Sequence, residues 1–191
     1  MSLKDIYSAC DDLERIPAIN KENWLYELDF LSRSLPHHAH VLQVGCGNGT
    51  RIIRLHERRP DLILAGLEID HELYDLARKN IAEAGVRANI VLGDITHPPG
   101  LSKFDYVLCL NNTLGYIPDE AGAFKHMKKL GRHSIISVYG EDFNEERAQE
   151  YFSSIGLSDY SKIKKYTQEQ VESWGGKLTI TPLGYLATLR N

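Results

Sequence analysis

The stretch VLQVGCGNGT, from Val41 to Thr50, decides the fold of this chain. Its apolar first half predicts a short buried strand. Gly45, Gly47 and Gly49 follow the strand, and glycines there allow a tight turn and a close approach of a ligand to the main chain. A helix is expected directly after the loop, and its N-terminus favours a negative group such as a carboxylate. The stretch therefore predicts a strand, a loop and a helix that together bind a nucleotide-like ligand.

The spacing of these glycines distinguishes between two kinds of nucleotide-binding loop. They form the pattern GxGxG, whereas the dinucleotide fingerprint GxGxxG needs a glycine at position 50, where this chain has Thr50. The difference counts against a nicotinamide or flavin dinucleotide. An NAD-dependent enzyme and a purely structural turn remain as weaker alternatives.

From residue 40 onward, predicted strands alternate with predicted helices. Apolar runs predict strands over residues 40–44, 62–68, 89–92, 104–110 and 134–139, and amphipathic segments predict helices over 49–57, 70–84, 120–130 and 145–155. This alternation indicates a mainly parallel sheet with helices on both faces. Near the end of the chain, Gly175 and Gly176 lie between segments 163–174 and 177–190, which predicts a hairpin that adds an antiparallel strand to the edge of the sheet.

The start of the chain is predicted to form an N-terminal helical cap (residues 1–35) on a domain that spans residues 36–191. Its best helical stretch carries Trp24 and Leu28 on one apolar face, and Pro36 ends the pattern. We expect this helix, with Trp24 and Tyr26, to lie over the ligand site as a lid. Simple packing on the sheet is the alternative.

The composition is that of an ordinary globular domain. The chain has 191 residues, 42% of them hydrophobic, and a formal net charge of −4, which suits one domain and argues against a nucleic-acid partner. The basic stretch 51–59 has helical spacing and is interpreted as the solvated face of a helix. No run is long enough to span a membrane, the start lacks the apolar segment of a signal peptide, and the cysteines are few. No membrane partner and a cytoplasmic location are therefore expected.

Acidic residues follow the second and third predicted strands. Glu68 ends the second strand about 20 residues after the glycine loop, where a carboxylate can accept hydrogen bonds from both hydroxyls of a ribose. Asp70 is the better cap for the next helix, which leaves Glu68 for a ligand. Asp94 follows the third strand, where it can accept from an adenine amino group, and Ile69 or Ile95 can pack on the ring. A capping role for Glu68 and an ordinary turn role for Asp94 are the alternatives.

Polar residues also follow the fourth predicted strand, in the segment LNNTLGY from Leu110 to Tyr116. Two asparagines and a threonine beside a buried apolar run are unusual. Because open α/β sheets bind ligands beyond the carboxyl ends of their strands, Asn111, Asn112 and Thr113 are expected at the ligand site. The alternative is an Asx-type turn that caps the next helix.

Together, these four strand ends resemble the class I S-adenosylmethionine-dependent methyltransferases. The resemblance is carried by VLQVGCGNGT, GLEID (66–70), VLGDI (91–95) and FDYVLCLNNTLGYI (104–117), and it covers residues 38–140. It implies a single Rossmann-like α/β domain with a seven-stranded, mostly parallel sheet, an antiparallel last strand and helices on both faces. It also implies S-adenosylmethionine as the cofactor.

The resemblance and the strand ends together give a set of predicted cofactor-binding residues: Gln43, Gly45, Cys46, Gly47, Gly49, Glu68, Ile69, Asp94, Ile95, Leu110 and Asn111. One position departs from the family pattern. The family often has an acid two residues before the first glycine, where this chain has Gln43. Gln43 can accept a hydrogen bond from the amino group of the cofactor, but it carries no charge.

The segment LCLNNTLGYI (108–117) is similar to the glycine and sarcosine N-methyltransferase group, in which this strand ends in leucine, glycine, asparagine and serine. Asn112 and Thr113 match the asparagine and the serine, whereas Asn111 replaces the glycine and Tyr116 replaces a histidine. The likeness favours a small-molecule amine as the acceptor. The predicted catalytic residues are accordingly Asn112 and Thr113, which would hold the acceptor, and Tyr116, which would line the pocket with Tyr139.

These residues predict methyl transfer by in-line displacement, in which the enzyme mainly aligns the nucleophile, the methyl group and the sulfur. No metal is expected, because His37, His38 and His40 precede the first strand and so lie at the wrong end of it for the cofactor. Two alternatives remain: a non-catalytic module that binds S-adenosylmethionine or its demethylated product, and a methyltransferase that acts on a protein side chain. The oligomeric state stays open, with a homodimer among the assemblies expected.

Overall fold

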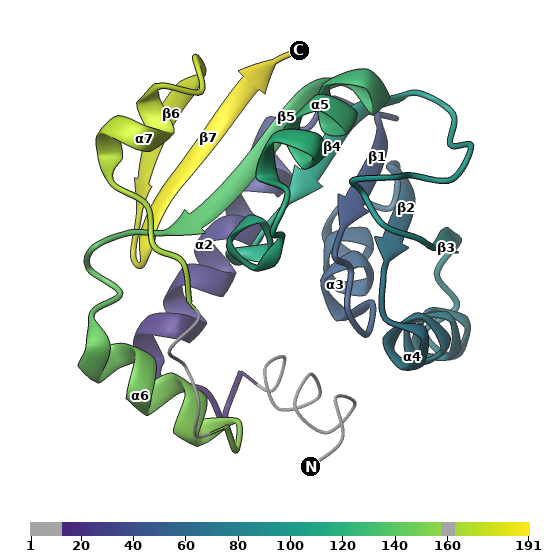
Figure 1. Cartoon of the computed structure of the whole chain (residues 1–191). Helices are drawn as coiled ribbons and strands as arrows, with labels where there is room; N and C mark the ends of the chain where they lie inside the picture. Colours follow the sequence, from purple (N-terminus) through teal and green to yellow (C-terminus); the bar gives the residue numbers. More distant parts are fainter. Residues whose placement is uncertain (1–12, 158–162) are drawn as a thin grey trace.

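Figure 1 shows a computed structural model of the chain, in which residues 13–157 and 163–191 are described. Their strands form one seven-stranded sheet in the order β3-β2-β1-β4-β5-β7-β6. The strands are β1 (His40–Val44), β2 (Ile63–Glu68), β3 (Ala88–Leu92), β4 (Phe104–Cys109), β5 (Gly131–Tyr139), β6 (Lys177–Thr181) and β7 (Gly184–Arg190). β1 to β5 pair in parallel, whereas β7 is antiparallel to both β5 and β6. The predicted mostly parallel sheet with an antiparallel last strand is confirmed.

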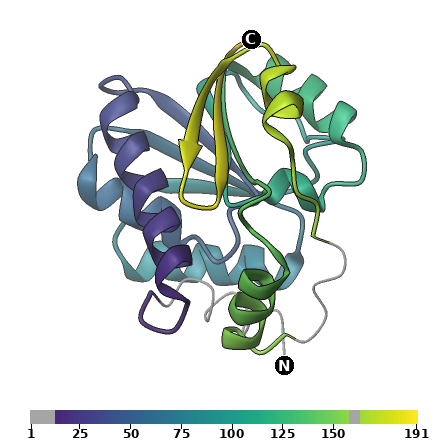
Figure 2. The same cartoon turned by 90° about the vertical axis from the view of Figure 1, so that its left-hand side faces the viewer.

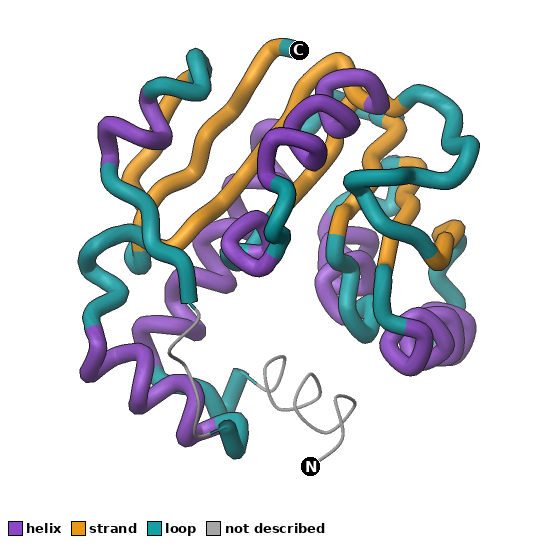
Figure 3. The backbone as a smooth tube through the Cα atoms, in the orientation of Figure 1, coloured by secondary structure: helices purple, strands orange, loops and turns teal. Residues whose placement is uncertain are grey.

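Helices cover both faces of this sheet, as Figure 3 shows. They are α2 (Ala18–Ser34), α3 (Thr50–Arg58), α4 (His71–Glu83), η1 (Thr113–Tyr116), α5 (Glu120–Leu130), α6 (Glu145–Ser154) and α7 (Gln168–Glu172). Apolar side chains of α2, α3 and α4 form one core with strand residues that include Val41, and those of η1, α5 and α7 form another with strand residues that include Leu42. Adjacent residues of β1 thus enter opposite cores, as expected for a strand that is buried on both sides.

The helix α6 lies beyond the end of β5 and outside these two layers (Figures 1 and 2). Its apolar residues form a third core with Tyr139, at the end of β5, and with Phe143. The fully buried Phe143 ring lies 4.1 Å from the Tyr139 ring and 6.4 Å from the Tyr151 ring, between their centroids. These ring contacts fix α6 beside the carboxyl ends of the central strands.

The predicted terminal hairpin is present, but its turn lies elsewhere. The turn is at residues 182–183, between β6 and β7, and not at Gly175 and Gly176. Segment 163–174 does not form a strand of this hairpin: it contains α7, because Thr167 and Gln170 form a capping box that starts a helix. Gly175 follows α7 with a φ of 81°, a left-handed conformation that suits a helix end.

α2 packs against the sheet, and Figure 2 shows it crossing one face. Trp24 is 4% exposed and belongs to the core of that face. This placement corresponds to the alternative of simple packing and not to a lid. Residues 1–12 of the predicted helical cap lie outside the described residues.

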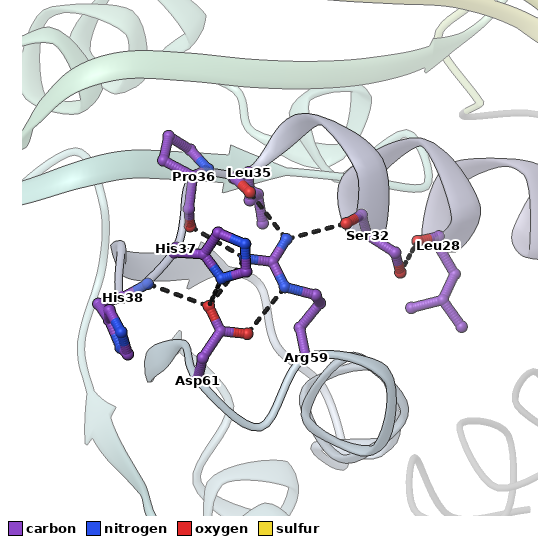
Figure 4. Close-up of polar contacts among 8 residues, drawn as sticks. All are labelled: Leu28, Ser32, Leu35, Pro36, His37, His38, Arg59 and Asp61. Carbon is purple, nitrogen blue, oxygen red and sulfur yellow. Dashed lines mark hydrogen bonds and ion pairs between the residues drawn. The ribbon is translucent and has the colours of Figure 1, made fainter.

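Arg59 fixes the C-terminal end of α2 (Figure 4). Its Nη1 donates hydrogen bonds to the carbonyl oxygens of Ser32 and Leu35, at 2.9 and 2.7 Å, and its Nη2 donates to that of Pro36 at 3.1 Å. Carbonyls at a helix end lack partners within the helix, so the guanidinium caps them. Arg59 also binds the carboxylate of Asp61 and holds the pKa of that carboxyl well below its usual range. This one side chain joins α2 to the segment between α3 and β2.

Candidate functional site

A cavity of about 610 Å³ opens at the carboxyl ends of the parallel strands, within the range of about 300–1,000 Å³ typical of small-molecule sites. The predicted site residues that line it are Gln43, Gly45, Cys46, Gly47, Glu68, Ile69, Asp94, Leu110, Asn111, Thr113 and Tyr116. The strand order puts the ends of β1, β2 and β3 on one side and those of β4 and β5 on the other. We call these sides the β1–β3 half and the β4–α6 half, because α6 completes the second.

The glycine loop brings bare backbone to the cavity. Gly45 and Gly47 have φ values of 62° and 56°, in the left-handed region that favours glycine. A Cβ at Gly45 would lie only 2.5 Å from Cγ2 of Thr113, which follows β4. The two halves of the cavity therefore meet at this glycine, and a side chain there would disturb both.

Glu68 is held at the end of β2 by three backbone N–H groups. Its Oε2 accepts from Gly47 at 2.7 Å, and its Oε1 accepts from Ile69 and Asp70 at 3.0 and 3.1 Å. Burial raises the pKa of this carboxyl even though these hydrogen bonds act in the opposite direction. A carboxylate has about four acceptor positions, so Glu68 keeps one for a hydroxyl of a ribose. As predicted, Asp70 caps α4 by accepting from the N–H of Leu73.

Asp94 makes the turn interaction considered for it and also lies at the cavity. Its Oδ1 accepts from the N–H of Thr96 at 2.8 Å, which is a turn interaction, and the residue also lines the cavity. Ile69, at the end of the neighbouring strand, is 67% exposed and lines the cavity too. An exposed isoleucine beside two acids provides an apolar face for a planar ring.

Two predicted cofactor residues, Gly49 and Ile95, do not line the cavity. Gly49 is the N-cap of α3 with a φ of 82°, and a Cβ there would lie 3.2 Å from the side chain of Ile81 on α4. Ile95 is buried in the core that contains α5. Gly49 therefore serves helix packing, and of the two isoleucines only Ile69 lines the cavity.

Asn112 also lies outside the cavity lining, which changes the role proposed for it. It is fully buried; its Oδ1 accepts from the N–H of Tyr139, and its Nδ2 donates to the carbonyl of Lys164, each at 3.1 Å. Both ends of the amide are thus used within the fold. Asn111 and Asn112 have φ values of 51° and 58°, a conformation that asparagine tolerates better than most residues. The pair is explained by this turn, and Asn112 is not placed to hold an acceptor.

The neighbours of Asn112 do face the cavity. Asn111 Oδ1 accepts from the Tyr139 hydroxyl at 3.1 Å, and Thr113 Oγ1 donates to the carbonyl of Leu110 at 2.7 Å. Tyr116 is 55% exposed and lies on the cavity wall, as does Tyr139. Of the three residues predicted as catalytic, only Thr113 and Tyr116 therefore line the cavity.

Arg51, predicted on a solvated helix face, is instead buried and lines the cavity. Its Nη1 donates to Oε2 of Glu27 on α2 at 2.7 Å, and its guanidinium carbon lies 4.8 Å from the centre of the Trp24 ring. Glu27 Oε1 accepts from Ser137 Oγ at 2.6 Å, and Ser137 Oγ accepts from the N–H of Asn111 at 2.8 Å. A buried polar network thus connects α2 to two cavity residues, Arg51 and Asn111.

Tyr116 and Tyr139 were predicted to line the β4–α6 half, but the part of its wall at α6 was not predicted from the sequence. It includes four side chains from α6 and the turn that follows it: Tyr151, Phe152, Ile155 and Leu157. The remaining unpredicted lining residues are Thr96, Ile117, Pro118 and Asp119. The apolar spacing of segment 145–155 indicated a helix but not which surface it would cover.

The ionisable groups of the cavity are mostly acids and phenols. Among the described residues that line it there is no histidine or lysine. Burial and the nearby Glu68 raise the pKa of the Cys46 thiol, so this thiol stays protonated at neutral pH. Within residues 13–157 and 163–191, no group of three or more His, Cys, Asp or Glu side chains is placed to hold a metal ion.

A family model for a methyltransferase domain matches residues 41–134, the segment with the glycine loop, both acids and the end of β4. The crystal structure of a candidate S-adenosylmethionine-dependent methyltransferase from Methanococcus maripaludis has a TM-score of 0.74 and 18% identity, covering 99% of this chain and 91% of that chain. Residues 41–134 thus form a methyltransferase domain, and the chain has the fold of the class I S-adenosylmethionine-dependent methyltransferases. Magnesium protoporphyrin IX methyltransferase from Synechocystis, solved with bound SAH, shares the fold with a TM-score of 0.63, 18% identity and coverage of 92% and 84%.

A relative with higher sequence identity is named for a different activity. A protein of Campylobacter concisus named carboxy-S-adenosyl-L-methionine synthase is 33% identical over 144 residues, which is 74% of this chain and 61% of that protein. Across three such synthases from Campylobacter species, the chain spans 37% to 61% of their length. The finer likeness to glycine and sarcosine N-methyltransferases stays a prediction.

S-Adenosylmethionine is the cofactor of this family, and the residues of the β1–β3 half fit it. Two acids, Glu68 and Asp94, end neighbouring strands, with the exposed Ile69 between them in sequence. Gly45 and Gly47 offer backbone without side chains. Separately, no helix among the described residues is both long and apolar enough to cross a membrane.

Proposed function

We propose that the protein is an S-adenosylmethionine-dependent methyltransferase that acts on a small molecule, with an amine nitrogen as the preferred acceptor. One observation carries this proposal. The cavity is continuous from Glu68 and Asp94, across the glycine loop, to Asn111 and Tyr139. A cofactor in the β1–β3 half and an acceptor in the β4–α6 half would therefore share one enclosure.

The residues of the β1–β3 half would hold the cofactor in the following way. Asp94 would accept from the adenine amino group, Ile69 would pack on the ring, and Glu68 would accept from a ribose hydroxyl. The backbone of Gly45 and Gly47 would contact the methionine part, and Gln43 would accept from its amino group. When bound, the cofactor supplies an electrophilic methyl group on a sulfonium.

The chain itself would contribute alignment more than acid–base chemistry. In-line displacement needs the nucleophile to be held opposite the leaving sulfur, and a neutral amine needs no strong base in that step. The described lining residues include no group that ordinarily titrates near neutral pH. This residue set favours an amine over a hydroxyl, because a hydroxyl would need to lose its proton during attack.

The decisive experiment has two stages. Calorimetry with S-adenosylhomocysteine should show binding, and labelled S-adenosylmethionine should then transfer its methyl group to members of an amine panel. Binding without any transfer would favour the non-catalytic module. Transfer to proteins but not to small molecules would favour a methyltransferase for protein side chains.

The similarity to the Campylobacter synthases supports a second candidate, the formation of a carboxylated S-adenosylmethionine. The structural observation in its favour is Arg51, a guanidinium beside the glycine loop that pairs with Glu27 through Nη1 and has further N–H donors for a carboxylate in the β1–β3 half. Mass spectrometry distinguishes the two candidates. After incubation with a metabolite extract, the methyltransferase converts S-adenosylmethionine to S-adenosylhomocysteine, whereas the synthase, with a carboxyl donor from the extract, yields S-adenosylmethionine in which a carboxyl group replaces a hydrogen.

A further inference from the structure

The β4–α6 half of the cavity has an apolar, aromatic wall that is fixed in place before any ligand binds. Tyr139, Tyr151 and Phe152 line it and are almost fully buried. Their rings are held through Phe143, which contacts Tyr139 and Tyr151, while the Tyr151 and Phe152 rings lie 5.1 Å apart in an edge contact. Rings packed in this way form a rigid surface that suits the flat or apolar body of a ligand.

A second hold on α6 comes from the opposite side. Arg15 Nε donates to the carbonyl of Ser154 at 2.7 Å, and Ile16 packs in the same apolar cluster as Tyr151. The C-terminal end of α6 is therefore tied to the segment that precedes α2.

Among the described residues that line this half, the charged side chain is an acid. Asp119, at the start of α5, lines the cavity and is exposed. The one cation among the described lining residues, Arg51, lies beside the glycine loop and is already paired with Glu27. Placing an anion against this wall would leave it without a partner in an apolar setting, which is costly, whereas an ammonium group can contact aromatic faces and Asp119.

We propose that the space between the end of β5 and α6 is a compartment for the apolar, ring-bearing body of a neutral or cationic acceptor, and that it rejects anions. The description of the occupant as a methyl acceptor rests on the proposed function. The compartment itself is a statement about binding. A non-reacting probe can therefore test it independently of catalysis.

The test uses a matched pair of probes on protein saturated with S-adenosylhomocysteine. 2-Phenylethylamine and 3-phenylpropionate share a ring and a short chain but end in opposite charges. Ligand-observed NMR titration should show the amine binding at least about tenfold more tightly than the carboxylate. Equal affinity, preference for the carboxylate, or binding of neither probe would overturn the proposal.

Variants in and beside the wall locate the binding. Tyr151→Ala should weaken the amine at least fivefold, by the loss of a buried ring contact of about 1 kcal/mol, without changing the affinity for S-adenosylhomocysteine. Leu157→Lys places a cation at the half-buried rim and should reverse the preference, whereas Ser153→Lys, on the exposed face of α6, should not. If Tyr151→Ala does not fold, the lysine pair still decides. The proposal is contradicted if the two lysine variants show the same preference between the amine and the carboxylate. If the protein binds the amine selectively but transfers no methyl group, the result counts against the proposed function and not against the compartment.

Discussion

Arg51 donates a hydrogen bond to Glu27 at 2.7 Å, and both side chains are almost completely buried. The pair connects α2, outside the matched methyltransferase segment, to the first turn of the helix behind the glycine loop. A buried ion pair costs much of its attraction in desolvation, but removing one partner leaves the other charge uncompensated.

We therefore expect Glu27→Gln to lower the free energy of unfolding by about 3–5 kcal/mol, with weaker binding of S-adenosylhomocysteine. The double variant Glu27→Gln/Arg51→Met should recover part of the stability but not the binding. Urea denaturation and calorimetry measure the two effects. Lys79→Ala, which breaks an exposed pair with Glu83 on α4, is the control and should change the unfolding free energy by less than about 1 kcal/mol. An equally small effect for Glu27→Gln would show that the buried pair does not matter.

Gly45→Ala should destabilise the protein for two separable reasons. The left-handed backbone costs an alanine about 1–2 kcal/mol, and the close approach of Thr113 adds about 1–3 kcal/mol of overpacking. Gly85→Ala is the matched control, because Gly85 has a similar φ of 66° with no atom within 4 Å of the added Cβ. The double variant Gly45→Ala/Thr113→Ser removes Cγ2 and should recover part of the loss in thermal unfolding. No recovery would assign the whole effect to the backbone.

Asn112→Ala is expected to lower the stability of the fold rather than to remove a contact with the acceptor. It removes one buried and one partly buried hydrogen bond, worth about 1 kcal/mol each, and leaves the buried N–H of Tyr139 without its side-chain partner, so a loss of about 2–4 kcal/mol is expected. Asn112→Asp keeps the acceptor for Tyr139 but not the donor to Lys164, and should be harmful as well. Denaturation curves check this. Unchanged stability with reduced turnover would restore the acceptor-binding role predicted from the sequence.

The affinity for S-adenosylhomocysteine should decrease as the pH is lowered, because Glu68 takes up a proton. Because burial raises the pKa of this carboxyl, it takes up a proton at a higher pH than an ordinary glutamate, and the protonated form accepts fewer hydrogen bonds from a ribose. The folded protein holds this proton more tightly than the unfolded chain, so protonation of Glu68 favours folding as the pH falls. A loss of affinity is therefore not a loss of fold. Calorimetry over a pH series, with circular dichroism alongside, should show this decline in the native chain and a flat, weaker profile in Glu68→Gln.

Local sequence signals predicted the parts of the fold that depend on neighbouring residues. The strand before Gly45, the cap at Asp70 and the helix 120–130 each follow from short-range spacing, and each is present. The site residues Glu68 and Asp94 were found for the same reason, because the carboxyl ends of parallel strands share one edge. The turn of the hairpin was misplaced because two local signals conflicted. The glycine pair indicated a turn after a strand, but the capping box starts the helix α7 in the segment before it.

The remaining parts depend on contacts between distant residues. Arg51 is buried because Glu27 reaches it from a helix 24 positions earlier, which the basic spacing of segment 51–59 does not reveal. Asn112 is committed to Tyr139 and Lys164, 27 and 52 positions later. Even so, the position of Arg51 in the first turn after a glycine loop was a usable signal, since ligands with carboxylates approach that end of a helix.

The separate core of α6 has a consequence for how such a chain can diversify. The residues that would recognise the cofactor are anchored in the layered sheet, whereas four of those that would recognise the acceptor belong to a helix outside it and the turn after it. Substitutions on α6 can therefore change which acceptor binds without changing the residues that would bind the methyl donor. Within a set of related chains, we expect selectivity to diverge fastest at Tyr151, Phe152, Ile155 and Leu157.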